Sequence, residues 1–176
     1  MEIFIVGALV VALMVFISTK IKRSAAEAFV PEFIERDDFL INKPAGFMTP
    51  IEGNREYLFE AYSRGFGEKK TRNVWQSHAL LTADSGLNFE AERENIKKSA
   101  GKILSERILE NETGDGKICL IECEKTEDNI RLIEFRKIVE NRARQKTYSL
   151  KISVLPPFRA HYIERINEMI NSFRLK

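Results

Sequence analysis

The chain has 176 residues, of which 44% are hydrophobic and 31% are charged, and its formal net charge is +2 at pH 7. This balance is typical of a folded protein and excludes a largely disordered chain. The net charge is too small to indicate a nucleic-acid-binding protein, so we expect no nucleic-acid partner.

The N-terminal segment is the most apolar part of the chain. Residues 3–17 read IFIVGALVVALMVFI without a charged side chain, and Ser18 and Thr19 follow. A membrane-spanning helix needs about 17–20 mostly apolar residues, and a helix satisfies its own backbone hydrogen bonds in lipid. The sequence therefore predicts a transmembrane anchor over residues 1–19 and an integral, single-pass membrane protein.

A cleaved signal peptide is the alternative interpretation of this segment. A signal peptide carries basic residues before its apolar region, whereas here only Met1 and Glu2 precede the run, and Lys20, Lys22 and Arg23 follow it. We therefore favour a retained anchor. Because Lys and Arg next to a membrane helix favour the cytoplasmic side, we expect the rest of the chain in the cytoplasm.

The remainder divides into a short tether and one domain. Residues 20–36 mix Ala, Glu and Pro31 without a clear period, which indicates a tether. Residues 37–176 have the size of one ordinary domain. We expect them to form a soluble α+β domain.

The two cysteines, Cys119 and Cys123, stand four residues apart. In a strand they share a face but lie about 13 Å apart, which is too far for a disulfide. In a helix the spacing suits a metal pair, but no second pair of ligands lies nearby. We interpret them as two small buried side chains in a reducing compartment.

The first half of the domain predicts three strands and one helix. Strand-like segments occupy 38–42, 57–62 and 74–82, and a long basic loop joins the last two into an antiparallel hairpin. Asn88 is a candidate N-cap for the helix, and Gly101 is its candidate C-cap.

Residues 103–110 allow two interpretations. They either extend that helix or form a strand that continues into the next one through the turn sequence Thr113-Gly114-Asp115-Gly116. Gly and Asp at these positions are typical of hairpin turns, so we favour the strand.

The second half predicts three strands and a final helix. The strands occupy 117–125, 130–140 and 148–154. The first two carry apolar residues on both faces, which indicates a sheet that is covered on both sides. Pro156 begins a helix whose apolar residues recur at helical spacing. The order of elements indicates an antiparallel sheet with helices packed on it.

Three segments are similar to a known family. They are KPAGFMTPI at residues 43–51, YSLKISV at 148–154, and the end of the last helix at 169–173. These segments resemble the PsbP-like superfamily of small α/β/α sandwich domains. The resemblance implies a non-enzymatic binding or assembly domain and supplies no catalytic residue.

Catalytic chemistry has little support in the sequence. The only histidines are His78 and His161, and a site shared between them stays open. A hydrolytic site also needs an oriented nucleophile and an oxyanion site, and no GxSxG motif is present. In the strand 74–82, alternation places Trp75 with Ala79 and Leu81, opposite His78. We expect no catalytic residue, no cofactor and no metal.

Two predicted turns carry basic side chains that are candidate contacts to an anionic surface. They are Lys69, Lys70 and Arg72 in one turn, and Arg142, Arg144 and Lys146 in the other. Near an anionic leaflet each such side chain gains about 1 kcal/mol. Two solvated turns are the alternative.

Together these observations predict a membrane-anchored interaction or assembly module that binds a protein partner. The alternative is a domain that binds a small ligand or a lipid head group, with weak hydrolytic activity. A buried polar pocket favours the ligand, whereas a flat exposed apolar patch favours the protein partner.

Overall fold

The structure is a computed structural model, and it describes most of the chain. The described residues are 11–20, 27–50, 56–63, 74–86, 88–110 and 116–176.

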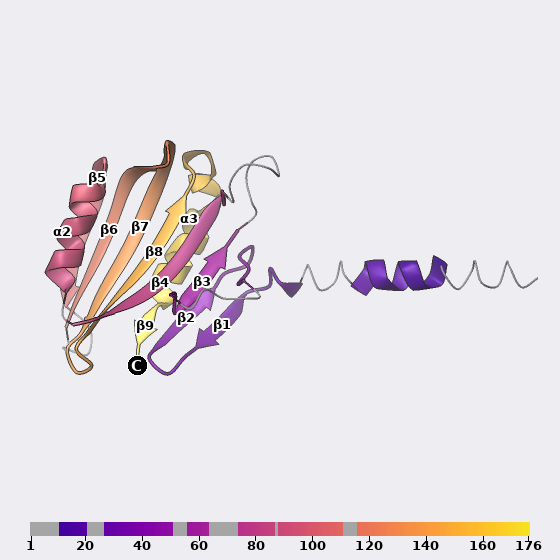
Figure 1. The fold of residues 1–176 in the computed structure, drawn as a ribbon, viewed down its shortest axis with the longest axis horizontal. Helices are drawn as coiled ribbons and strands as arrows, with labels where there is room; N and C mark the ends of the chain where they lie inside the picture. The colour runs from indigo at the N-terminus through magenta and orange to yellow at the C-terminus, as the bar shows by residue number, and fades with distance from the viewer. Residues whose placement is uncertain (1–10, 21–26, 51–55, 64–73, 87, 111–115) are drawn as a thin grey trace, which may run out of the picture.

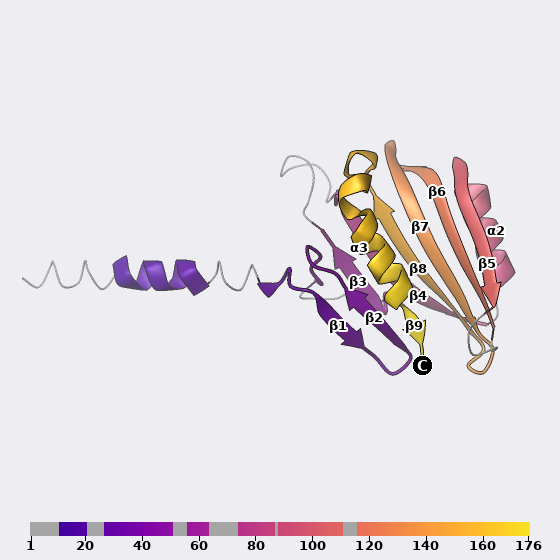
Figure 2. The same ribbon diagram turned by 180° about the vertical axis from the view of Figure 1, so that it is seen from behind.

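Residues 11–20 form a helix that lies apart from the sheets in both views (Figures 1 and 2). All of its side chains are exposed, and five of its large apolar side chains, including Met14 and Phe16, are at least 59% exposed. Within the described residues no helix is both long and apolar enough to cross a membrane. Residues 1–10 of the predicted anchor lie outside the described part of the chain.

The domain consists of antiparallel strands and two α-helices in its described residues. The first elements are β1 (Glu32–Glu35), β2 (Phe39–Lys43), β3 (Phe59–Tyr62), β4 (Ser77–Ser85), α2 (Phe89–Ser99) and β5 (Lys102–Glu110). The later elements are β6 (Lys117–Glu127), β7 (Ile130–Asn141), β8 (Lys146–Val154), the 3₁₀ turn η1 (Pro156–Phe158), α3 (Arg159–Ser172) and β9 (Arg174–Leu175).

The strands form two sheets. The larger has six strands in the order β3-β4-β8-β7-β6-β5, and the smaller has the order β1-β2-β9. All of their pairings are antiparallel. The smaller sheet joins the two ends of the domain, because β9 follows α3 directly and pairs with β2.

The main core lies between the six-stranded sheet, α3 and β2. In β8, Tyr148, Leu150, Ile152 and Val154 alternate onto this face and are fully buried. They meet a set of buried side chains from α3 and the residue after it, namely Tyr162, Ile166, Met169 and Phe173. This arrangement confirms the strand that was predicted at residues 148–154 and the apolar face that was predicted for the last helix.

A smaller core lies on the opposite face of the sheet, beneath α2. Phe89 and Ile96 of α2 pack there against Cys119, Cys123 and Ile121 of β6, with Ile138 of β7 beside them. The helices therefore cover opposite faces (Figures 1 and 2), as the expected α/β/α sandwich requires. However, α2 lies over the edge of the sheet that β5 and β6 form. Among the described residues, no helix covers the part of this sheet face that β3, β4 and β8 form (Figure 1).

Most of the predicted elements agree with the structure. The C-cap of α2 is Ala100 and not the predicted Gly101, Pro156 begins the 3₁₀ turn η1 and not α3 itself, and β9 was not predicted. The strand interpretation of 103–110 is confirmed by β5, and the predicted helix is confirmed by α2. The tether prediction is wrong at its C-terminal end, because β1 (Glu32–Glu35) pairs with β2 there. β1 is an exposed edge strand, so it buries too few side chains to produce an alternating sequence pattern.

The predicted position of Trp75 is also wrong. A bend at Gln76 precedes β4, so the strand alternation does not reach Trp75. Ala79 and Leu81 face the main core, whereas Trp75 lies with His78 on the other side of the sheet.

Candidate functional site

The half of the sheet that α2 leaves uncovered is the candidate functional site. It consists of side chains of β3, β4 and β8 that point away from α3, and we call it the open face. Strand register places on this face Glu60, Tyr62, His78, Leu80, Thr82, Ser149, Lys151 and Ser153. Most of these side chains are partly exposed, although Ser149 is buried.

A groove of about 450 Å³ crosses the end of the open face. Its floor is formed by His78, Leu80, Leu132, Lys151 and Ser153. Its walls are formed by Val74 and Trp75 before β4, and by Glu127, Asp128 and Ile130 at the turn between β6 and β7. The floor of the groove therefore contains both apolar and polar side chains, one wall is apolar and aromatic, and the other wall carries two carboxylates.

The acidic wall is fixed by a tight hairpin turn. Glu127 pairs with Ile130, and the two residues between them, Asp128 and Asn129, have φ angles of 51° and 66°. Two-residue hairpin turns require such positive φ values, and Asp and Asn tolerate them well. The turn therefore holds Glu127 and Asp128 at the groove by backbone geometry.

The aromatic wall is fixed by a ring contact. Trp75 stacks on Tyr62 of β3, with ring centroids 4.1 Å apart and planes 27° apart. Trp75 is the only tryptophan in the chain. Because Tyr62 is anchored in the sheet, it supports Trp75 as part of the groove wall.

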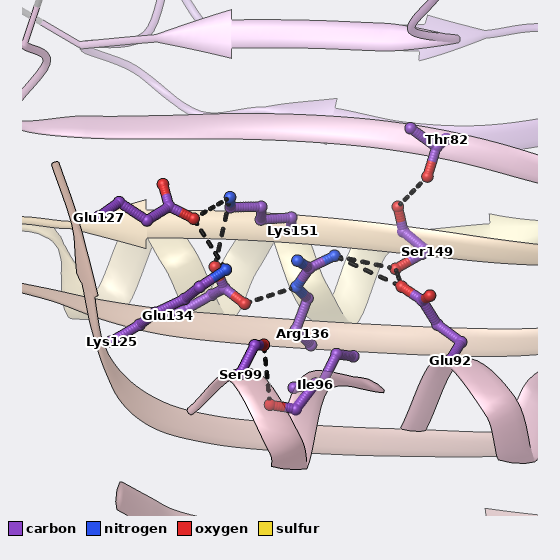
Figure 3. A network of polar contacts seen from close by, with 10 residues as sticks. All are labelled: Thr82, Glu92, Ile96, Ser99, Lys125, Glu127, Glu134, Arg136, Ser149 and Lys151. Atoms are coloured by element: carbon purple, nitrogen blue, oxygen red, sulfur yellow. Dashed lines mark hydrogen bonds and ion pairs between the residues drawn. The ribbon is translucent and has the colours of Figure 1, made fainter. Parts of the chain in front are cut away.

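A network of charged side chains lies beside the groove (Figure 3). Glu134 of β7 is only 1% exposed, and its Oε1 accepts a 2.7 Å hydrogen bond from Arg136. The ammonium of Lys151 lies 3.4 Å from Oε2 of Glu134 and 3.1 Å from Glu127. Lys125 lies 2.8 Å from Glu127. The ammonium of Lys151 is thus held between two carboxylates in the groove floor.

The network continues toward α2 through Arg136. Its guanidinium donates a 3.2 Å hydrogen bond to Ser149 Oγ, and it lies 3.7 Å from the carboxylate of Glu92 on α2. Ser149 in turn donates to Glu92 over 3.1 Å. This chain of contacts connects the groove floor to the helix that covers the other half of the face.

The network keeps Glu127 ionised at neutral pH. Burial acts to raise the pKa of Glu127, but hydrogen bonds and positive charge from Lys125 and Lys151 outweigh it, and the pKa lies below its ordinary value. The groove wall therefore carries a fixed negative charge.

The two histidines do not share a site. His78 lies in the groove floor, where its Nε2 is 2.9 Å from Glu60. His161 lies on α3, beside Tyr162 and Arg165, and α3 covers the opposite face of the sheet. His78 on β4 and Ser153 on β8 are register partners, and Glu60 on β3 contacts His78. The three side chains therefore follow one another across the open face.

The predicted basic contacts are only partly described. Lys69, Lys70 and Arg72 lie outside the described residues. The other three lie in and beside the turn between β7 and β8, where Arg142 is 3.1 Å from Glu140, and Arg144 and Lys146 both pair with Asp38. Two carboxylates therefore compensate much of the positive charge of this turn.

The cysteines and carboxylates offer no metal centre in the part of the chain that the structure describes. Cys119 and Cys123 are free thiols that are buried against α2. Burial raises the pKa of Cys119 to about 11 and also raises the pKa of Cys123. Both behave as small apolar side chains in the smaller core.

Sequence reasoning identified His78 but missed most of the groove. The alternation of β8 places Lys151 and Ser153 on one side of the strand, opposite Ile152 and Val154. That alternation is the sequence signal that could have indicated an open polar face. The sequence around Trp75 does not indicate that it lies beside the β6–β7 turn, because β8 and β7 lie between β4 and β6 in the sheet.

The fold defined by these elements is that of the PsbP-like α/β proteins, as the sequence resemblance implied. Cyanobacterial PsbP (CyanoP) from Synechocystis sp. PCC 6803 matches with a TM-score of 0.54 and 9% identity, over 84% of this chain and 94% of CyanoP. LpqN of Mycobacterium tuberculosis, described as involved in cell envelope biogenesis, matches with a TM-score of 0.55 and 10% identity, over 84% of this chain and 91% of LpqN.

The protein Mog1 has a similar structure. A point mutant of Mog1 matches with a TM-score of 0.50 and 10% identity, over 83% of this chain and 96% of that one. No protein-family profile matches the chain, and no curated protein sequence matches it. At these identities the similarity is one of fold.

Proposed function

We propose that the chain is a membrane-anchored, non-enzymatic interaction module that binds an extended segment of a partner protein in the groove. The observation that carries this proposal is the half-covered sheet. α2 leaves the open face without a helix, and the groove on that face combines apolar and polar side chains in its floor with one aromatic and one acidic wall. Binding sites commonly combine an apolar surface with a few fixed polar groups.

The proposed anchor comprises residues 1–19. Its described part is an apolar helix whose side chains do not pack on the domain, since residues 11–20 are all exposed. Exposed large apolar side chains of this kind are expected where lipid surrounds a helix. Lys20, Lys22 and Arg23 then favour a cytoplasmic domain.

Membrane fractionation of the full chain tests the anchor. We expect the protein in the membrane fraction after alkaline extraction, with the domain protected from protease added outside intact cells. Recovery of the full chain, N-terminus included, in the aqueous fraction would exclude the anchor. Digestion of the domain from outside would exclude the cytoplasmic orientation.

The shape of the groove favours a protein segment over a deeply enclosed ligand. A volume of about 450 Å³ lies within the range of small-molecule sites, which is about 300–1,000 Å³. However, the groove runs across an exposed sheet face, and its walls come from the segment before β4 and from the β6–β7 turn. An extended segment can follow such a face and place its side chains in the groove at alternate positions.

Site-dependent capture from native membranes tests the binding role. Leu80→Lys places a charge on the groove floor, and Ser153→Trp fills it. Leu109→Lys and Ser105→Trp are matched controls on β5, where both residues are exposed. We expect a protein that is retained by the wild type and both controls and is lost from both groove variants. Equal retention by all five proteins would contradict the proposal.

Weak hydrolysis is a second candidate, because Glu60, His78 and Ser153 lie in a row across three strands. A serine nucleophile also needs a donor for the oxyanion, and the nearby ammonium of Lys151 already pairs with Glu127 and Glu134. The geometry therefore supports binding better. Release of nitrophenol from an acetate ester that Ser153→Ala abolishes would favour hydrolysis instead.

A further inference from the structure

The bend before β4 reverses the faces of two neighbouring side chains. Ser77, the first residue of β4, is fully buried on the face that also carries Ala79 and Leu81. Strand alternation would continue from Ser77 by placing Gln76 on the open face and Trp75 in the main core. Instead, Trp75 lines the groove, and the side chain of Gln76 reaches α3. The groove therefore owes its aromatic wall to the bend.

Hydrogen bonds from α3 and from the end of β8 hold Gln76 in this bend. The hydroxyl of Tyr162 on α3 donates to Oε1 of Gln76 over 3.0 Å. The backbone N–H of Leu155 donates to the carbonyl oxygen of Gln76, also over 3.0 Å. The bond from Tyr162 joins residues that lie 86 positions apart in the chain, and it comes from the helix that covers the opposite face of the sheet (Figure 2). Gln76 is thus fixed through its backbone and through its side chain.

Tyr162 is itself held in one orientation by its neighbours. It is only 4% exposed, and its ring meets that of Phe47 edge to face, with centroids 5.6 Å apart. The guanidinium of Arg165 lies 5.5 Å from the centre of the same ring. Because a ring that is packed on several sides in a dense core has little freedom to turn, the core determines where the hydroxyl of Tyr162 lies.

We propose that Tyr162 is a positioning residue for the groove: its hydrogen bond to Gln76 holds the bend, and the bend holds Trp75 in the groove wall. This inference rests on the proposed function, since it gives α3 a part in a binding site on the other face of the sheet. The stacking of Trp75 on Tyr62 then orients the indole ring that the bend has placed.

Trp75 reports its own position. It is the only tryptophan, so the tryptophan emission of the full chain in detergent micelles comes from the groove wall alone. Quenching by acrylamide, a small neutral molecule, measures how accessible the indole ring is. Tyr162→Phe removes the hydroxyl and keeps the packed ring, Gln76→Ala removes the acceptor, and Gln76→Glu keeps an acceptor oxygen.

We expect Tyr162→Phe and Gln76→Ala each to raise the quenching constant of Trp75 by about twofold, the lower end of the two- to tenfold effect that one neutral hydrogen bond has on the conformation it holds. The double variant is expected to rise no further than Gln76→Ala, because both substitutions remove the same bond. Gln76→Glu still accepts a hydrogen bond and is expected to stay close to the wild type.

Tyr148→Phe is the matched control. The hydroxyl of Tyr148 also donates a 3.0 Å hydrogen bond from the main core, but its acceptor is Asp38. Tyr148 is the register partner of Ala83, near the end of β4 that lies away from Gln76. We therefore expect the quenching of Trp75 to be unchanged in this variant. Urea unfolding followed by circular dichroism compares the stabilities of all variants.

The outcomes separate this inference from the function on which it rests. Unchanged quenching in Tyr162→Phe and Gln76→Ala, or an equal rise in Tyr148→Phe, would overturn the positioning role whether or not a partner binds. If Tyr162→Phe fails to fold, Gln76→Ala decides alone, because Gln76 is only partly buried.

Capture from native membranes then tests whether the position of Trp75 matters for binding. We expect Tyr162→Phe to retain less of the partner than Tyr148→Phe does, although neither side chain lines the groove. Equal retention despite increased quenching would overturn the role of Tyr162 in the site. A wild-type chain that captures no partner would contradict the proposed function, and the quenching result would still decide what holds Trp75.

Discussion

The ammonium of Lys137 on β7 donates hydrogen bonds to the carbonyl oxygen of Ile170 over 2.8 Å and to that of Phe173 over 2.7 Å. These carbonyls belong to the last turn of α3 and to its C-cap. The last carbonyls of a helix lack partners within the helix, and a cation beside them is favourable. Lys137 therefore holds the end of α3 on the face opposite the groove.

Removing this cap is expected to destabilise the domain. Lys137→Met keeps much of the aliphatic stem but leaves two carbonyl groups without their donor. We expect a loss of about 1.5–3 kcal/mol in the free energy of unfolding, measured by urea titration of the full chain in micelles. Lys98→Met on the exposed side of α2 is the control. A loss below about 0.5 kcal/mol for Lys137→Met would show that the cap contributes little.

Gly116 is expected to be intolerant of any side chain. Its φ is +138°, and a Cβ there would lie 2.2 Å from the carbonyl oxygen of Glu140. Since backbone atoms must move to relieve this contact, Gly116→Ala is expected to cost more than about 2 kcal/mol of unfolding free energy. In Gly101→Ala the nearest atom lies 3.5 Å away, and a small effect is expected. Equal melting temperatures of the two variants would contradict this expectation.

Glu106 is expected to contribute to acid sensitivity. Hydrogen bonds from Arg93 and then Lys97 lower its pKa against the opposing effect of burial. A carboxylate whose folded-state pKa is lowered stabilises the protein above its unfolded value of about 4.3, and this contribution disappears as the pH falls through the folded value. Glu106→Gln is expected to cost roughly 0.5 kcal/mol at pH 7.

The measurement is the free energy of unfolding of the two proteins between pH 7 and pH 3. The difference between wild type and Glu106→Gln is expected to shrink as the pH falls below the unfolded carboxylate value. A difference that stays constant over this range would show that Glu106 does not connect α2 to β5 through an ion pair.

The buried thiols are expected to be unreactive in the folded protein. Cys119 and Cys123 are completely buried, and burial raises the pKa of Cys119 to about 11. The reactive thiolate therefore forms only about one thousandth of the Cys119 population at pH 8. We expect no reaction with a disulfide reagent at pH 8 until denaturant is added, and then two thiols per chain. Rapid labelling of the folded chain would show that α2 does not cover β6 as described.

Much of the fold could be predicted from the sequence because its elements have strong local signals. The alternation of Tyr148, Leu150, Ile152 and Val154 identifies one buried face of β8. The turn sequence that follows residues 103–110 indicates a strand there, which is β5, and not an extension of the preceding helix. β1 could not be predicted in this way, because its only support is pairing with β2 at an exposed edge.

The site was harder to predict than the fold. The burial of Glu134 has no local signal, since it depends on Arg136 on the same strand and on Lys151 on the next one. Trp75 reaches the groove only because a bend at Gln76 interrupts the alternation. Such relationships depend on strand register and on the order of strands in the sheet, which follow from packing across the whole domain.

Photocrosslinking from the groove floor tests the binding role most directly. A photoreactive amino acid replaces Leu80 in the full chain in native membranes, and the same residue at exposed Leu109 on β5 serves as the control. We predict a specific adduct with one partner protein from position 80 that is absent from position 109. The same adducts from both positions, or none from position 80, would contradict a partner site in the groove.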